Sequence, residues 1–156
     1  MATKLTRYMR PECFIPDLAG KSREDALRGI IHVAAEKRLV TDENYVIARL
    51  MERENIQSTA VGNGIAIPHC FTDGISSLIF IVARSRGGIE FDSFDGKPTQ
   101  IVFLLMGNRQ EYSLHLKALA QIARLIKSMA FIQKIASAGS VQDMIKAFAE
   151  EEAKIC

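Results

Sequence analysis

The sequence predicts an α/β fold in which a mixed sheet is sandwiched between helices. Helical hydrophobic periodicity appears near both ends of the chain, whereas the middle contains short apolar runs typical of strands. The 156 residues are 48% apolar and 24% charged, an ordinary globular balance that allows one sizeable core. Because no linker, repeat or low-complexity segment interrupts the chain, we expect a single domain over residues 1–156.

Two helices are expected in the first third of the chain. Ser22 is a suitable N-cap for a helix that runs to about Leu39, and Thr41, followed by acidic residues, begins the second helix. Each helix has an apolar stripe at helical spacing. The stripes consist of Leu27, Ile30, Ile31 and Ala34 in the first helix, and of Val46, Ile47, Leu50 and Met51 in the second.

The middle of the chain predicts the sheet. Residues 78–83 and 101–106 are nearly continuous apolar runs, as expected for central strands that are covered on both faces. Between them, residues 89–94 alternate between apolar and polar, which predicts a further strand, and Asp95-Gly96 predicts a turn. Helical periodicity returns from Ser113 through Ile126, with further helical stretches near 129–136 and 140–150.

Composition argues against several classes of function. A net charge of +2 is too small to indicate binding to nucleic acid or to a membrane. The apolar runs are too short to cross a bilayer, and residues 1–4 lack a signal-peptide pattern, so we expect a cytoplasmic protein. The odd, widely spaced cysteines Cys13, Cys70 and Cys156 favour a reducing compartment and provide no metal-ligand spacing.

His69 is the first candidate for chemistry. It follows a turn at Gly62-Asn63-Gly64, a short apolar strand at 65–67, and Pro68, whose fixed φ stiffens the approach. Glycines upstream allow the backbone to come close to a bound anion. The alternative is a surface histidine that merely ends the strand, and local features do not separate the two interpretations.

Arg53 and His115 continue apolar stripes. Arg53 lies three residues after Leu50 and so needs an anion, although a simpler role is to interact with the dipole at the end of its own helix. His115 lies in the first turn of its helix on the apolar face, where positive potential keeps the imidazole neutral. A core histidine with satisfied hydrogen bonds is the alternative. His32 lies on a polar row, so we expect it to be solvated.

Together these residues resemble the mannitol- and fructose-type IIA family of the bacterial phosphoenolpyruvate-dependent phosphotransferase system. The similarity rests on the string from Ser58 to His69, which ends in Gly-Ile-Ala-Ile-Pro-His, on Met51-Glu-Arg-Glu54, and on residues 115–120. It covers about residues 15–149. Ala60 and Cys70 depart from the residues common in the family, without removing a group that phosphoryl transfer needs.

The resemblance implies a mannitol/fructose-type IIA fold and a phosphoryl carrier without metal or cofactor. His69 would be the phosphorylated residue, at Nε2, with His115 as its supporting neighbour and Arg53 as the active-site arginine. The expected additional phosphate donors are the hydroxyls of Ser58 and Thr59 and the backbone N–H groups around Gly62 and Gly64.

The resemblance also implies partners. The phosphoryl donor would be a histidine-containing phosphocarrier protein. Residues 88–98 are most similar to the nitrogen-regulatory branch of the family, which implies regulatory partners. The alternative is a sugar-specific component that passes phosphate to a IIB domain. A hydrolase or nuclease is disfavoured because no nucleophile-elbow motif, metal-ligand set or paired catalytic carboxylates accompany His69.

Overall fold

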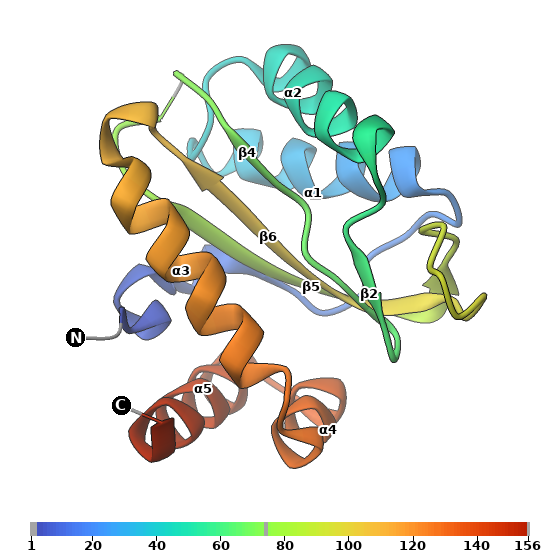
Figure 1. The fold of residues 1–156 in the computed structure, drawn as a ribbon, viewed down its shortest axis with the longest axis vertical. Coiled ribbons are helices and arrows are strands. Elements are labelled where there is room, and N and C mark those ends of the chain that lie inside the picture. Colours follow the sequence, from blue (N-terminus) through green and yellow to red (C-terminus); the bar gives the residue numbers. More distant parts are fainter. Residues whose placement is uncertain (1–2, 74, 156) are drawn as a thin grey trace.

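The computed structural model describes residues 3–73 and 75–155, and these form a mixed sheet with helices on both faces (Figure 1). The sheet order is β1-β5-β6-β3-β2, and β4 also pairs with β6. The strands are β1 (Phe14–Ile15), β2 (Ala60–Gly62), β3 (Ile65–Ala66), β4 (His69–Phe71), β5 (Ile79–Ile89) and β6 (Thr99–Gly107). Pairing is antiparallel in β5–β6 and β2–β3 and parallel elsewhere, which confirms the predicted fold class.

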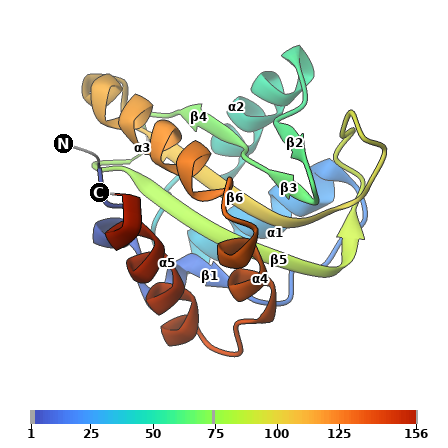
Figure 2. The ribbon, with the colours of Figure 1, turned by 60° about the horizontal axis from the view of Figure 1, so that its bottom comes forward.

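Two helices cover one face of the sheet and three cover the other (Figure 2). The first layer contains α1 (Arg23–Glu36) and α2 (Glu43–Ile56). The second contains α3 (Tyr112–Leu125), α4 (Met129–Ser137) and α5 (Val141–Ile155), together with the short 3₁₀ helix η1 (Leu5–Tyr8). Two further 3₁₀ turns are η2 (Pro11–Cys13) and η3 (Arg109–Glu111).

Strands β5 and β6 divide the core into two halves. In β6, Val102 and Leu104 pack with α1 and α2, whereas Ile101 and Phe103 pack with α3, α4 and α5. Successive side chains of a strand point to opposite faces, so a strand covered on both sides needs apolar residues at every position. The two continuous apolar runs are therefore central strands, as predicted.

The helix starts follow capping chemistry. The Ser22 hydroxyl accepts a hydrogen bond from Asp25 N at 3.1 Å, which confirms the predicted cap of α1. In α2 the cap is Asp42, not Thr41, and its carboxylate accepts from Tyr45 N at 3.1 Å. Helix α1 ends at Glu36, short of Leu39, because the chain turns there and Arg38 takes a positive φ of 61°.

The expected strand over residues 89–94 is wrong. Strand β5 continues through residues 84–88 and ends at Ile89, and Glu90 forms only an isolated bridge with Ser22. The Glu90 carboxylate accepts from Asp92 N at 3.1 Å, and Asp92 has a φ of 56°, so a local turn replaces the strand. The alternation buries Phe91, but Phe94 is 84% exposed.

Two buried charged side chains connect elements of the fold: one links the sheet to α4, and the other links α5 to η1. Arg84 in β5 is 4% exposed and donates to the carbonyls of Ile135 and Ala138, at the end of α4, at 3.1 and 2.7 Å. The Glu152 carboxylate in α5 accepts from Leu5 N at 2.6 Å and so holds η1. Within residues 3–73 and 75–155, no helix has the length and apolar character required to cross a membrane.

Candidate functional site

His69 is the first residue of β4 and lies beside a cavity at the edge of the sheet. In parallel register it faces Leu105 of β6, and the Pro68 carbonyl accepts from Leu105 N at 2.9 Å. Helix α2 packs along β4, as Figure 1 shows. Between them is a cavity of about 340 Å³, lined by Arg49, Glu52, Arg53, Ile56, His69, Cys70 and Phe71.

The hydrogen bonding of His69 defines its tautomer. Nδ1 lies 2.8 Å from the Ile67 carbonyl, which can only accept, so Nδ1 carries the proton. In the neutral ring, Nε2 then has a free lone pair. Burial lowers the pKa of His69, assisted by the Arg53 charge and opposed by the Ile67 hydrogen bond and the Glu54 charge. The half-buried ring is therefore neutral at neutral pH.

His115 is buried next to His69. Its ring centroid lies 6.0 Å from that of His69 and 4.2 Å from that of Phe71, and the residue is 1% exposed. Burial, followed by the charge of protonated His69, lowers the pKa of His115 to about 4. Among the residues described, neither of its ring nitrogens has a hydrogen-bond partner, so His115 is not a satisfied core histidine.

Gly107, the last residue of β6, makes room for His115. A Cβ at this position would lie 3.1 Å from His115 Cγ and 3.2 Å from His115 Cβ, and it would overlap with Nδ1. Any side chain would therefore displace the imidazole. The glycine fixes how closely α3 can bring its histidine to the sheet.

Arg53 contacts the end of its own helix and also lines the cavity, whereas its binding of an anion stays a prediction. Its Nη1 donates to the carbonyl of Gln57, the C-cap of α2, at 2.8 Å, so the guanidinium interacts with the end of its own helix. The half-buried side chain also lines the cavity, and its charge lowers the pKa of His69. The structure thus brings together His69, His115 and Arg53, as the sequence predicted.

The two hydroxyls expected to bind phosphate have other partners in this structure. The Ser58 hydroxyl donates to the Phe91 carbonyl at 2.5 Å and accepts from Ala60 N at 3.2 Å. The Thr59 hydroxyl donates to the Glu54 carboxylate, and Thr59 is 6% exposed. The Thr59 carbonyl accepts from Ile67 N, two residues before His69, but neither Ser58 nor Thr59 is among the residues that line the cavity.

The glycine turn lies further away. Gly62, Asn63 and Gly64 all have positive φ, of 86°, 56° and 78°, and they form the turn that the sequence predicted. Ile65 faces Ile101 on β6, whereas His69 faces Leu105, four residues further on. At about 3.3 Å per residue, the turn begins roughly 13 Å from His69 along the strand. Its Asn63 N–H donates to Asp95 at 3.0 Å.

Glu54 is a member of the site that the sequence analysis missed. The residue is 1% exposed, and its carboxylate accepts from Thr59 N at 3.0 Å and pairs with Arg23 at 3.7 Å. The Thr59 carbonyl accepts from Ile67 N at 3.0 Å, and the Ile67 carbonyl holds His69. Glu54 lies four residues after Leu50 and so continues the buried stripe of α2. This spacing could have predicted from the sequence that the carboxylate is buried.

Exposed apolar side chains lie on α2 and α3, the two helices next to His69. The Phe71 ring packs against His115 and, at 5.4 Å, against Tyr112. We call Ile56, Tyr112 and Leu116 the apolar rim; they are 80%, 55% and 47% exposed. Apolar side chains on exposed helix positions were the sequence signal for this rim.

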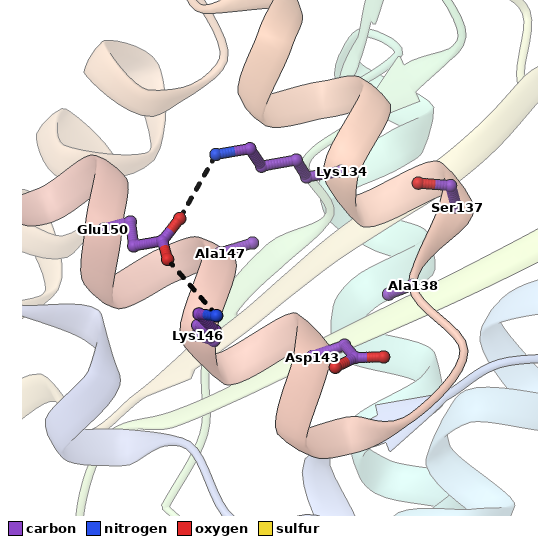
Figure 3. Close-up of a pocket in the computed structure, with 7 residues that line it drawn as sticks. All are labelled: Lys134, Ser137, Ala138, Asp143, Lys146, Ala147 and Glu150. Carbon is purple, nitrogen blue, oxygen red and sulfur yellow. Dashed lines mark hydrogen bonds and ion pairs between the residues drawn. The ribbon is translucent and has the colours of Figure 1, made fainter.

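Other polar clusters do not match this site. A second cavity, of about 280 Å³, lies between α4 and α5, but Figure 3 shows that Lys134 and Lys146 both reach Glu150, so both lysines of this cavity already have a carboxylate partner. In the described part of the chain, no three His, Cys, Asp or Glu residues gather as metal ligands would. His32 is exposed between Glu36 and Glu43, as predicted.

Comparisons with known proteins identify the family. Residues 7–151 match the family described as "Phosphoenolpyruvate-dependent sugar phosphotransferase system, EIIA 2". A nitrogen regulatory protein of Bradyrhizobium diazoefficiens is 36% identical over 88% of this chain and 90% of its own length. A fructose-specific EIIA component of the phosphotransferase system from Haloferax volcanii is 32% identical over 83% of this chain and 84% of its own.

A solved structure has the same fold. The nitrogen regulatory protein IIA-Ntr from Neisseria meningitidis superposes with a TM-score of 0.85 over 94% of this chain and 99% of its own, at 21% identity. The family match spans nearly the whole chain and includes His69, Arg53 and His115. The protein therefore belongs to the EIIA 2 family of the phosphoenolpyruvate-dependent phosphotransferase system.

Proposed function

We propose that this protein is a phosphoryl carrier in which His69 accepts the phosphoryl group of a histidine-containing phosphocarrier protein. The observation that supports this most directly is the bond between Nδ1 and the Ile67 carbonyl. It orients the ring and leaves Nε2 as the nucleophilic nitrogen. The lowered pKa of His69 keeps that nitrogen unprotonated at neutral pH.

The transfer step exchanges one nitrogen–phosphorus bond for another. The Nε2 lone pair of His69 attacks the phosphorus in line, the bond to the donor imidazole breaks, and the electron pair returns to the donor ring. The proton on Nδ1 stays on His69. The transition state is loose, with negative charge on three equatorial oxygens, so prepositioned donors provide most of the stabilisation.

Arg53 and His115 are the donors that we assign to this step. Arg53 lines the cavity with His69 and brings a permanent positive charge. With a pKa of about 4, His115 is neutral at pH 7, so one of its nitrogens offers an N–H without adding repulsion to protonated forms of His69. Its unpartnered nitrogens give it the capacity to bind a phosphoryl oxygen or the His69 ring.

Phosphate binding by Ser58, Thr59, Gly62 and Gly64 stays a prediction. In the conformation described, we assign Ser58 and Thr59 a supporting role, because their hydroxyls fix the chain that leads to His69. The turn at 62–64 would contribute its N–H groups only after a movement along the sheet, since the register puts it roughly 13 Å away.

We further propose that the phosphorylation state of His69 selects regulatory partners. A phosphoryl group adds about −1.5 to −2 charges beside the apolar rim, which changes the surface that a partner meets. Similarity to a nitrogen regulatory protein favours this role. Similarity to a fructose-specific EIIA component favours the alternative, in which the phosphoryl group passes to a IIB domain for sugar uptake.

The carrier proposal is tested by phosphorylation with purified donor proteins and phosphoenolpyruvate. Acid-labile, base-stable label should map to His69 by mass spectrometry and vanish in His69→Ala. His32→Ala is the matched control, because His32 is exposed and does not line the His69 cavity, and it should be labelled normally. Label that persists in His69→Ala would contradict the proposal. Rapid transfer from the labelled protein to a IIB domain would select the sugar-uptake role over the regulatory one.

A further inference from the structure

Arg49 is a second guanidinium at the His69 cavity, and nothing in the sequence pattern singled it out. It lies one turn before Arg53 on α2, so both side chains leave the same face of the helix, with Cβ atoms about 5–6 Å apart. Both line the cavity together with His69. Its charge also acts on Cys70, where it lowers a pKa that burial raises to about 12.

The hydrogen bonds of Arg49 are incomplete. Nη1 lies 3.0 Å from the carboxylate of Glu52, whose side chain is 65% exposed, so this ion pair contributes little. The Nε atom is shielded from solvent and has no hydrogen-bond partner within the described residues. A buried donor without an acceptor costs free energy, and such a group in a native protein calls for an explanation.

The location of the buried nitrogens without hydrogen-bond partners suggests why Arg49 Nε lacks an acceptor. Across residues 3–73 and 75–155, the buried side-chain nitrogens without a partner are Arg49 Nε and the two ring nitrogens of His115. Both residues flank His69, one from α2 and the other from α3. By contrast, the buried Arg84 donates to four carbonyls. Unpartnered buried oxygens, Glu12 Oε2 and Thr99 Oγ1 among them, also occur elsewhere in the described part of the fold. These nitrogens, however, lie on both sides of His69, where an anion could accept from Arg49 Nε and from the one N–H of the neutral His115 ring.

The charges at the cavity also favour a role for Arg49 in binding a phosphoryl group. A phosphoryl group on His69 carries about −1.5 to −2 charges, and Arg53 alone supplies one positive charge while also donating to the Gln57 carbonyl. Glu54, a buried carboxylate whose charge acts on His69, already has Thr59 and Arg23 as partners. Arg49 is the additional cation at the cavity, and its weak partner Glu52 is easily exchanged.

On the basis of the proposed carrier function, we infer that Arg49 is a second phosphoryl-binding guanidinium, which exchanges Glu52 for a phosphoryl oxygen when His69 is phosphorylated. The guanidinium fork suits this task because it can offer two parallel N–H groups to one anion. Release of Glu52 then alters the charge pattern on the outer surface of α2. Phosphorylation of His69 would thereby also change the surface around Glu52.

The test uses phosphoramidate, a small donor that needs no docking surface. Nε2 of His69 attacks its phosphorus, the P–N bond breaks, and ammonia leaves. We expect Arg49→Ala to be phosphorylated about tenfold more slowly than the wild type, the loss expected for one hydrogen bond to a charged group. Arg49→Lys should recover part of the rate, since it keeps the charge but loses the fork.

Arg28→Ala is the matched control, because Arg28 is a helical arginine that, like Arg49, pairs with an exposed glutamate but does not line the His69 cavity, and its rate should equal the wild-type rate. Equal rates for the wild type and Arg49→Ala would overturn the inference. So would a loss seen only with the protein donor, since that result assigns Arg49 to docking. Absence of label on wild-type His69 would instead refute the carrier function.

A second measurement uses only the wild-type protein, so it does not require that an Arg49 variant folds. In the wild-type protein labelled with ¹⁵N, the Arg49 Nε–H signal should shift when His69 is phosphorylated, as its donor gains an acceptor. The Arg28 Nε–H signal should stay in place. An unchanged Arg49 signal on fully phosphorylated protein would overturn the inference.

Discussion

Gly107→Ala should displace His115 and thereby impair transfer, although no titratable residue is replaced. The added Cβ would lie 3.1 Å from His115 Cγ, whereas unstrained carbon contacts lie at about 3.5–4.0 Å. Because Gly107 ends β6 without a positive φ, the backbone itself accepts alanine. Overpacking of this kind costs about 1–3 kcal/mol of stability. A misplacement of about 1 Å in a catalytic group costs on the order of 10² in rate.

The assay combines urea unfolding with the rate of His69 phosphorylation. Gly87→Ala is the matched control, because Gly87 lies in β5 and an added Cβ there meets nothing within 4 Å. A double-mutant cycle isolates the contact: in the His115→Ala background, Gly107→Ala should cost far less, since the overlapping ring is gone. Equal costs in both backgrounds, or full activity in Gly107→Ala, would refute the reasoning.

Two further predictions concern the charges around His69. The pKa of about 4 for His115 is below the ordinary 6.5, so the unfolded chain binds a proton that the folded protein does not. Protonation of His115 in the unfolded chain therefore lowers the free energy of unfolding as the pH falls below 6.5. The loss reaches roughly 3 kcal/mol at pH 4, and it is absent well above pH 6.5. Urea unfolding across this range should show a flatter profile for His115→Gln. Glu54→Gln should lower the pKa of His69 further, because the Glu54 charge raises it. NMR titration measures this shift, and Glu24→Gln, at an exposed glutamate, should leave it unchanged.

The central fold was predictable because a strand that is buried on two faces requires a simple hydrophobic pattern in the sequence. Strands β5 and β6 need apolar residues at every position, and the helices need stripes, so periodicity located them. The short strands β1, β2 and β4 escaped because two or three residues carry no periodicity, whereas the equally short β3 was located by the glycine turn that precedes it. The turn at Asp92 also escaped, because a side chain bonding to its own backbone is not visible in an apolar–polar alternation.

The candidate site was predictable to the extent that motifs and helix registers point to it. His69, Arg53 and His115 come from the family motif and the apolar stripes, and the structure places them together. Spacing places Glu54 on the buried stripe but does not give its partners Thr59 and Arg23, and Arg49 reaches the cavity only because α2 packs against β4. The role of Gly107 likewise emerges only when α3 is placed against the end of β6.

The distribution of satisfied and unsatisfied groups links stability to function in this fold. Away from the cavity, the carboxylate of Glu152 accepts from Leu5 N and Gln121 Nε2, so a buried charge there strengthens the contacts between elements. Next to His69, His115 and Arg49 retain buried nitrogens without hydrogen-bond partners among the described residues, which lowers stability in the unphosphorylated protein. A ligand that binds the folded state alone stabilises it, and a phosphoryl group that completes these bonds acts in the same way. Phosphorylation should therefore raise the unfolding midpoint of the wild type more than that of Arg49→Ala.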